Sequence, residues 1–377
     1  MAGFVMKQAG SVPARWDQAI GVFDSGSGGM VAASYLARML KDSGIAAGTY
    51  FFGDTANLPY GKRTQENVAA LSDAVIERLA PVCPVIGIAC NTASAAWSNF
   101  GRAGKAGTRP QVFSVVQVAA ELGYERARTV LDARSNLRTK VVGVLGTELT
   151  ATIQSHAAVI VQLHRAALSK AIGHELPLVP YEFGPAGLRP TLPAGTIDFA
   201  TTPHIGVLRE DEQAPGGTTR AAIVNWDPPA ELPQAVRIVA RDAQKLVAAV
   251  DVAHILDEEG RVKMEWRDRL SEYLAQVSQD LMQRRATSLI LGCTHFEYFE
   301  RDFSMLLPTL AARGGIVSPS GALATRLLDA YLAYIEAHPV QPVVEARAAC
   351  FQFSGERPPD ATFKALGLAE VTLVSPT

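Results

Sequence analysis

The sequence predicts an α/β protein of two pseudo-symmetric domains, each with three layers built around a mostly parallel sheet. Its 377 residues suit two or three domains that each bury a core of their own. Apolar runs of strand length alternate with longer stretches of helical periodicity, which is the pattern of a parallel sheet covered by helices on both faces. An apolar run that ends in cysteine occurs twice, which indicates two similar halves.

The first half contains four strand-like runs. Residues 20–23 (IGVF) lead through the glycine-rich loop 24–29 (DSGSGG) into a helical pattern. The run 49–54 (TYFFGD) leads through LPYG into a helix with apolar positions Val68, Leu71, Val75 and Leu79. The run 82–90 (VCPVIGIAC) precedes the helical start TASAAWSNF, and 111–118 (QVFSVVQV) reads as a fourth strand.

The second half has the same layout. Residues 141–146 (VVGVLG) lead through TELT into the helical run 151–163, as residues 20–23 do through their own loop. Residues 288–299 (SLILGCTHFEYF) match residues 85–94 (VIGIACNTAS), because each has an apolar run, a cysteine and a threonine within two residues of it. Both similarities are short, so internal duplication and chance explain them equally well.

The region 184–233 is rich in Pro and Gly, which is typical of irregular structure. Within it, residues 204–208 (HIGVL) and 220–226 (RAAIVNW) are expected to pair as a hairpin. The stretch 234–257 then predicts an amphipathic helix packed on the core, with apolar positions Val239, Ala243, Leu246 and Val250.

Charge and composition exclude some classes of function. The chain has 35 Lys and Arg against 37 Asp and Glu, and no stretch concentrates positive charge, which argues against nucleic acid and membrane surfaces as partners. The N-terminal MAGFVMKQAGSVPARW lacks a sustained apolar core with a cleavage site, and no run approaches the length of a membrane span. We therefore expect a cytoplasmic protein. Four cysteines in so long a chain do not make a disulfide framework, so their surroundings decide their roles.

The glycine-rich loop does not match a nucleotide-binding motif. After Gly26 and Gly28, a dinucleotide fingerprint requires a third glycine where Val31 stands, and no Walker lysine follows. The loop still leads into a helix N-terminus, whose backbone N–H groups can bind a substrate carboxylate. Taken alone, Asp24 and Ser25 read more readily as helix caps than as reactive groups.

Two cysteines are the strongest candidates for chemistry. Cys90 and Cys293 each end an apolar strand, at the edge where open α/β sheets bind ligands. The polar residues that follow them are Asn91, Thr92, Thr294 and His295. A thiol at a helix N-terminus has its thiolate favoured by the helix dipole and by nearby donors. An inert buried residue is the simpler reading for either cysteine alone, but two in matching contexts favour function.

Two thiols in one site suit the inversion of a stereocentre. One group removes a proton from one face of a carbon and the other returns a proton to the opposite face, whereas a single base tends to retain configuration. Thiols serve as base and acid when their pKa values lie near the working pH. Asp24 near one thiol and His295 near the other would move protons or hold each thiol in its active state.

Four segments resemble, in order, the four signatures of the glutamate racemase family. They are IGVFDSGSGG, DTANLPYGKRT, IACNTAS and LILGCTHFEYF. Fainter agreement runs through VVGVLGTELTATIQS, PLVPYEFG, IVSPSGALATRLLDAYL and the tail FQFSGERPPDATFKALGL. The resemblance therefore extends from about residue 20 to the C-terminus, apart from residues 188–265.

The resemblance implies an isomerase without cofactor or metal, whose two α/β domains face one another across a cleft that holds the active site. The small-molecule partner it implies is glutamate, interconverted between its L and D forms to supply D-glutamate for peptidoglycan, the cell wall and cell shape. It implies Cys90 and Cys293 as the paired acid and base, assisted by Asp24 and His295. The implied substrate-binding positions are Asp24, Ser25, Tyr60, Gly61, Asn91, Thr92, Thr147, Thr150, Thr294 and His295.

The resemblance also implies a division of the chain. Residues 19–116 with 316–377 form the first domain, and residues 117–315 form the second, with an insertion at about 188–265. The insertion would cover the cleft, form an oligomer interface or bind a regulator. Leu176 and Pro177 stand where the family commonly has a further cysteine. A homodimer is compatible with the sequence, which does not decide the oligomeric state.

Four other readings stay open. An aspartate racemase would differ in substrate by one methylene, worth about 1 kcal/mol of discrimination, although His295 favours glutamate because aspartate racemases tend to carry a glutamate there. A cysteine hydrolase would pair Cys293 with His295, but a residue two positions away rarely aligns as the base, and Cys90 would have no role. A zinc site would use both cysteines, His295 and Asp24 without the usual closely spaced ligand pair. The last is a non-catalytic binding module, against which the intact signature residues argue.

Overall fold

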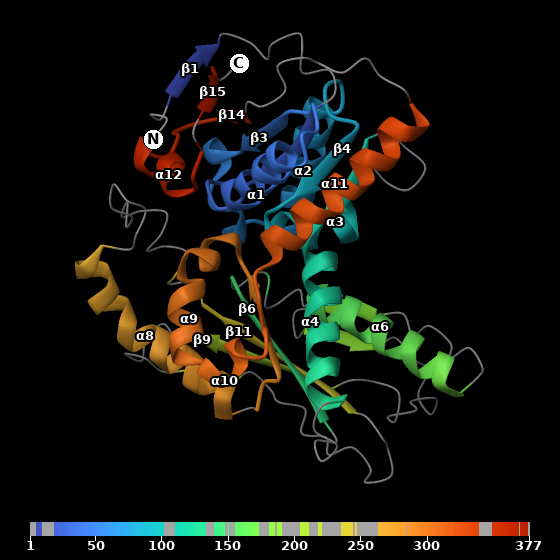
Figure 1. Ribbon diagram of the computed structural model, residues 1–377. Coiled ribbons are helices and arrows are strands. Elements are labelled where there is room, and N and C mark those ends of the chain that lie inside the picture. The colour runs from blue at the N-terminus through green and yellow to red at the C-terminus, as the bar shows by residue number, and fades with distance from the viewer. Residues whose placement is uncertain are drawn as a thin grey trace.

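The structure is a computed structural model that describes residues 5–9, 19–101, 110–132, 139–147, 150, 155–172, 181–184, 187–190, 204–210, 218–220, 235–243, 246, 263–283, 285–338, 349–368 and 370–375. These residues form two main sheets, one above the other in Figure 1, each with helices packed on it. A small antiparallel ribbon is formed by β7 (Tyr181–Gly184) and β8 (Gly187–Pro190). The predicted α/β class with mostly parallel sheets is confirmed.

The first sheet has seven strands, and every neighbouring pair is parallel. In spatial order they are β1 (Val5–Ala9), β15 (Glu370–Val374), β14 (Ala349–Phe353), β3 (Thr49–Gly53), β2 (Ile20–Asp24), β4 (Val85–Ile88) and β5 (Gln111–Ser114). Strand β2 is buried along its whole length. Its side chains alternate between two cores, with Ile20 and Val22 in one and Phe23 in the other, as the pleat of a strand requires.

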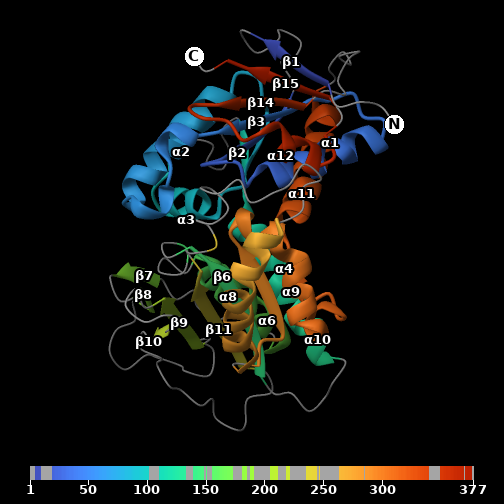
Figure 2. The ribbon, with the colours of Figure 1, turned by 90° about the vertical axis from the view of Figure 1, so that its left-hand side faces the viewer.

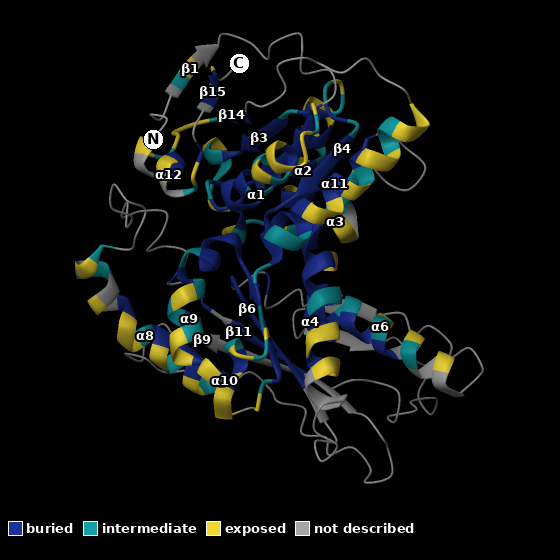
Figure 3. Cartoon of the chain, in the orientation of Figure 1, coloured by how far each residue is buried: buried dark blue, intermediate teal, exposed yellow. Residues whose placement is uncertain are grey.

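Helices cover both faces of the first sheet. Helices α1 (Met30–Asp42) and α11 (Pro319–Ala337) pack on one face, together with α12 (Asp360–Ala365). Helices α2 (Gln65–Leu79) and α3 (Asn91–Phe100) pack on the other. Figure 3 shows the consequence, with the central strands in the buried colour and the outer sides of the helices exposed. Both faces of the central strands are thus kept from water, and β2, β3 and β4 are buried along their whole length.

The second sheet has six strands, and all of its pairs are parallel except β10 with β9. In spatial order they are β10 (Thr218–Arg220), β9 (His204–Glu210), β11 (Ala235–Asp242), β6 (Thr139–Gly146), β12 (Ser288–Gly292) and β13 (Ile316–Val317). One face is covered by α4 (Val115–Asp132) and α6 (Ser155–Ile172). The other is covered by α8 (Met264–Gln283), α9 (Glu300–Leu306) and α10 (Pro308–Ala311).

Two crossings between the sheets lie within the described residues. The chain leaves the first sheet where β5 runs directly into α4, and it returns where β13 is followed by α11. In Figures 1 and 2 one end of each helix lies at the waist between the sheets, from which α4 runs down beside the second sheet and α11 runs up beside the first. That the chain divides into two domains at residues 116 and 316 stays a prediction. Strand β13 belongs by its pairing to the second sheet, and β1, which precedes residue 19, belongs to the first.

The fourth predicted strand is wrong in its second part. It ends at Ser114, and residues 115–118 begin α4. The apolar run is continuous because α4 contributes to two cores: Val115 and Val118 pack with the first sheet, while Ala119 packs with the second. Between residues 115 and 120 only Gln117 is exposed, so this part of the helix lacks the polar positions by which helical periodicity is recognised.

The helix predicted at residues 234–257 is also wrong in its first part, which forms strand β11. This strand pairs with β6 in register along its full length, and its Ile238 and Val239 enter different cores. The predicted hairpin is confirmed in part, because β9 pairs with β10, and residues 221–226 lie outside the described residues. Strands β9, β10 and β11, all within the region 188–265, therefore extend the second sheet beside β6.

Glu297 lies beside the return crossover, in the 3-10 helix η4 (Thr294–Phe299). Its carboxylate is buried and accepts hydrogen bonds from the hydroxyls of Ser318 and Ser320, the latter at 2.5 Å, at the start of α11. Burial raises the pKa of Glu297 to about 7, helped by the nearby charge of Glu300 and opposed by the serine hydrogen bonds. This carboxyl therefore ties the second sheet's loop to a helix of the first sheet.

We expect Glu297→Gln to change how stability depends on pH. Because the pKa is raised from 4.5 to about 7, the native state keeps a proton that the unfolded chain releases. The contribution of Glu297 to stability is therefore full below pH 4.5 and is lost as the pH rises through 7. The loss should be roughly 2 to 3 kcal/mol between about pH 5 and about pH 8, and the glutamine variant should lack it. Urea unfolding at both pH values measures this.

The matched control is Glu336→Gln, at the exposed end of α11, which should change stability equally at both pH values. If wild type and Glu297→Gln keep a constant difference between the two pH values, Glu297 does not release its proton on unfolding in this range.

Candidate active site

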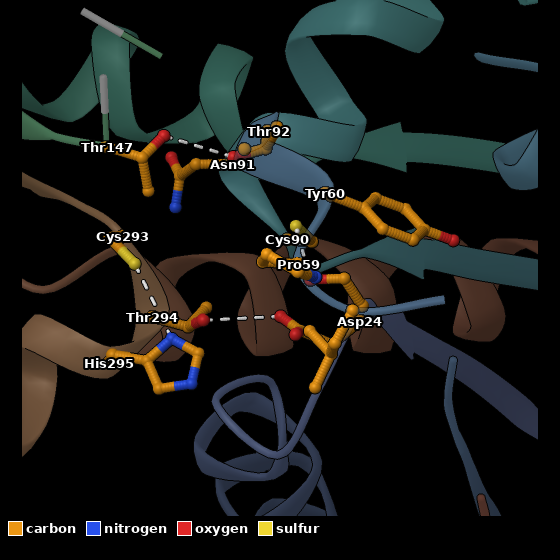
Figure 4. Close-up of a pocket in the computed structure, with 13 residues that line it drawn as sticks. Asp24, Pro59, Tyr60, Cys90, Asn91, Thr92, Thr147, Cys293, Thr294 and His295 are labelled. Carbon is orange, nitrogen blue, oxygen red and sulfur yellow. Dashed lines mark hydrogen bonds between the residues drawn. The ribbon is translucent and has the colours of Figure 1, made fainter. Parts of the chain in front are cut away.

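A pocket lies between the two sheets, at the carboxyl ends of their central strands (Figure 4). Strands β2, β4, β6 and β12 all lead into it, and this is the edge at which parallel α/β sheets bind ligands. The lining residues are Asp24, Ser25, Leu58, Pro59, Tyr60, Gly61, Cys90, Asn91, Thr92, Thr147, Cys293, Thr294 and His295.

The structure brings the sequence-predicted residues together. All of them line the pocket except Thr150, whose hydroxyl lies behind the lining and contacts those of Thr92 and Thr147. Leu58 and Pro59 also line the pocket and were missed, although they stand inside the predicted segment DTANLPYG. Nothing marks them as ligand contacts in the sequence, because apolar residues before a tyrosine are equally expected in an ordinary loop.

Asp24 ends β2 and reaches across to the second half of the chain. Its Oδ1 accepts a hydrogen bond from the Gly26 N–H at 2.8 Å, and its Oδ2 accepts one from the Thr294 hydroxyl at 3.2 Å. The N-cap residue of α1 is Gly29, which makes no side-chain cap itself, and the helix-cap reading of Asp24 and Ser25 stays a prediction. Gly28 is required at this contact, because a Cβ there would collide with the Thr294 side chain.

Cys90 is the N-cap residue of α3, and its sulfur accepts a hydrogen bond from the Ala93 N–H at 3.4 Å. The Ser25 hydroxyl lies 3.3 Å from the same sulfur. Burial, followed by the charge of Asp24, raises the pKa of Cys90 to about 12, and the hydrogen bonds from Ser25 and Ala93 oppose the rise. The expectation that the helix N-terminus favours the thiolate is therefore corrected: the donors act in that direction, but burial outweighs them.

Cys293 enters the same pocket from the second half, between β12 and η4 (Figure 4). Its sulfur lies 3.5 Å from Nδ1 of His295, and both side chains are buried. A residue two positions away can therefore reach the thiol, while its alignment as the base stays a prediction. The extended backbone of Cys293 followed by the tight turn of η4 brings the ring back over the sulfur.

Hydroxyl groups close the pocket on the side of α3. The Thr92 Oγ1 lies 3.2 Å from Thr147 Oγ1 and 3.3 Å from Thr150 Oγ1, and the Thr147 hydroxyl donates to Thr150 at 2.9 Å. Thr92 belongs to the first half of the chain and the other two to the second. The threonines therefore join the two sides of the pocket, and they can turn their hydrogens toward a ligand oxygen.

The loop that carries Tyr60 is anchored by Asp54. The Asp54 carboxylate accepts hydrogen bonds from the Tyr60 hydroxyl at 2.6 Å, from the Ser354 hydroxyl at 2.7 Å and from the Asn57 amide. Burial and this hydrogen bond raise the pKa of Tyr60 far above its usual range. Tyr60 therefore lines the pocket as a neutral phenol, and Asp54 is a supporting residue that the sequence did not single out.

The pocket residues do not form the zinc site weighed from the sequence. In the part of the chain that the structure describes, no three His, Cys, Asp or Glu side chains are grouped so that they could hold a metal ion.

Among the described helices, none combines the length and the apolar character needed to cross a bilayer.

These features define an α/β fold of two facing sheets whose shared pocket receives one cysteine from each half. Solved structures with a similar fold include glutamate racemases. The isoform RacE1 from Bacillus anthracis matches with a TM-score of 0.54 over 94% of this chain and 96% of that chain, at 19% identity. The enzyme from Francisella tularensis in complex with D-glutamate matches with a TM-score of 0.54 over 96% and 98%, at 16% identity.

Curated relatives match shorter segments. The glutamate racemase of Cereibacter sphaeroides is 44% identical over 79 residues, which are 21% of this chain and 28% of that protein. The glutamate racemase of Corynebacterium glutamicum is 36% identical over 135 residues, 35% of this chain and 43% of that protein. The alignments thus span less than half the length of these relatives. No protein-family model matches the chain. The resemblance to glutamate racemases is confirmed in sequence and in fold.

We expect Asp24→Asn to lower the pKa of Cys90, because it removes the negative charge that helps to raise it. Alkylation of Cys90 at about pH 8, followed by mass spectrometry of the labelled peptide, should become faster, since the thiolate is the reacting form. Asp42→Asn, on the exposed end of α1, is the control and should leave the rate unchanged. A slower or unaltered rate in Asp24→Asn would contradict the electrostatic account.

Proposed function

We propose that this protein is a cofactor-independent racemase that interconverts L-glutamate and D-glutamate. One observation carries the proposal: Cys90 and Cys293 line a single pocket, and each comes from a different half of the chain. An arrangement of this kind allows an acid and a base to approach one carbon from two sides. The sequence similarity to curated glutamate racemases supports glutamate as the substrate.

The reaction balances with the two thiols alone. A thiolate on one side takes the α-proton and becomes a thiol, and the electron pair passes into the substrate carboxylate. The thiol on the other side then donates its proton to the opposite face of the carbon and becomes the thiolate. Each direction of the reaction uses a different sulfur as the base, and the enzyme returns to its starting state by moving one proton between the two sulfurs.

The charges of the pocket favour an amino acid as the substrate. A substrate ammonium group near Asp24 would neutralise the carboxylate that helps to raise the pKa of Cys90, so binding would ease formation of the thiolate. His295, at 3.5 Å, would hold or exchange the proton of Cys293. The threonine hydroxyls and the N–H groups at the start of α3 would stabilise the negative charge that develops on the carboxylate.

The cellular role follows from the same proposal. A glutamate racemase would supply D-glutamate for peptidoglycan and would act in the cytoplasm, where its amino-acid substrate is found. Aspartate is the competing substrate, because it is shorter by one methylene, worth about 1 kcal/mol of discrimination in a pocket. Circular dichroism of L-glutamate and L-aspartate incubated side by side with the enzyme distinguishes the two.

We expect Cys90→Ala and Cys293→Ala each to lower racemisation by at least about 100-fold, because each removes one of the two proton-transfer groups. The controls are Cys83→Ala and Cys350→Ala, which change buried cysteines outside the pocket and should retain activity once folded. Near-normal turnover in either pocket variant would refute the two-thiol assignment.

Deuterated water tests the same assignment without mutation. Early in the reaction, the product enantiomer should carry deuterium at the α-carbon, while recovered substrate should not, because the returning proton comes from the opposite thiol. Deuterium in the recovered substrate at the same rate would indicate a single base.

A cysteine hydrolase is the second candidate, favoured by the 3.5 Å contact between Cys293 and His295. It leaves Cys90 without a role. Incubation with an activated acyl ester, followed by mass spectrometry and an assay of ester hydrolysis, distinguishes a hydrolase from a racemase. A hydrolase would form an acyl adduct on Cys293 and hydrolyse the ester repeatedly, whereas a racemase would not hydrolyse it catalytically. A binding module without activity would bind glutamate in calorimetry and show no racemisation.

A further inference from the structure

We propose that His156 is a positioning residue, which holds the Asn91 side chain so that its amide N–H groups face the substrate. The inference deepens the proposed racemase function and rests on it for the identity of the ligand, a carboxylate of an amino acid. Sequence reasoning did not single out His156, and it does not line the pocket itself.

Asn91 supplies the first observation. It is the first residue of α3, directly after Cys90, and its side chain is buried and lines the pocket. Its Nδ2 has no hydrogen-bond partner among the residues that the structure describes. In Figure 4 this nitrogen is turned toward the side of the pocket where the two cysteines lie, and the amide oxygen is turned away. A buried donor without a partner is costly, so this one is suited to a ligand.

His156 supplies the second observation. It comes from α6, in the other half of the chain, and its Nε2 lies 3.1 Å from Asn91 Oδ1. The ring is buried and packs over Gly292, where a Cβ would lie 3.4 Å from its Cε1. Gly292 ends β12 and directly precedes Cys293. The ring is thus held between the residue that follows one cysteine and the residue that precedes the other.

The protonation of the ring fixes the orientation of the amide. Burial lowers the pKa of His156 to about 4, so the ring is neutral at ordinary pH and carries a single proton. The other ring nitrogen, Nδ1, has no hydrogen-bond partner among the described residues, so a proton there would be a buried donor without an acceptor, and we infer that the proton lies on Nε2, facing Asn91 Oδ1. The amide oxygen is then occupied by His156, and the amide nitrogen must face the pocket. Without this donor the amide could turn over and present its oxygen, which would repel a carboxylate.

The kinetic test compares substitutions that remove or keep the donor. We expect His156→Leu to raise KM for glutamate about tenfold with a smaller change in kcat, since one carboxylate contact is lost. His156→Gln retains an N–H in a similar place and should restore most of the loss. His164→Leu is the matched control: it changes another buried histidine of α6, one that contacts Tyr124 outside the pocket, and should leave KM unchanged.

A double-mutant cycle separates positioning from a merely structural role. If His156 acts through Asn91, then His156→Leu in an Asn91→Ala background should raise KM less than twofold further. The same tenfold effect in both backgrounds would overturn the proposal, as would a failure of His156→Gln to restore binding when it folds normally.

A spectroscopic test needs no substrate. NMR spectra of wild type and His156→Gln, both with nitrogen-labelled histidine rings, are compared, and the signals that the variant lacks are assigned to His156. At neutral pH these signals should be those of a neutral ring with its proton on Nε2. A proton on Nδ1, or a ring that titrates as an exposed histidine does, would overturn the assignment. If wild type fails to racemise glutamate, the proposed function fails, while this measurement still decides the tautomer of His156 and hence which end of Asn91 faces the pocket.

Discussion

The pocket depends on the close approach of two sheet edges that belong to different halves of the chain. Polar side chains bridge the gap directly: the Thr294 hydroxyl donates to Asp24, and the Thr92 hydroxyl meets that of Thr147. Gly28 makes this distance possible, because any side chain there would occupy the space of Thr294. The pocket thus exists only when the two halves are in contact, and each of its two cysteines follows a strand end whose position the sheet fixes.

The same closeness excludes water and sets the electrostatics. Cys90, Asp24 and Asn91 are all buried, so charges inside the pocket are poorly screened and polar groups without partners are costly. Burial therefore favours the protonated form of Cys90, although a helix N-terminus and two donors act on its sulfur. A positively charged group of a bound ligand near Asp24 would shift that balance toward the thiolate.

Much of this arrangement could be predicted from the sequence, because its signals are local. The apolar run ending at Cys90 and the turn after Asp24 mark strand ends, and strand ends of a parallel sheet meet at one edge. Strand β11 was predicted as a helix, because residues 235–242 carry apolar positions that fit both periods and only pairing with β6 decides between them. His156 was missed because its role comes from a contact with Asn91, 65 residues earlier in the chain, which no local pattern encodes.

Helix α4 gives this architecture a mechanical property. Its first turn is packed into the core of one sheet and its next turns into the core of the other, so a single helix belongs to both hydrophobic cores. Dividing the molecule at this waist would leave each fragment with an exposed apolar surface that is normally buried against the other half. The two lobes should accordingly melt as a single cooperative unit, and neither should survive as an autonomous folding module.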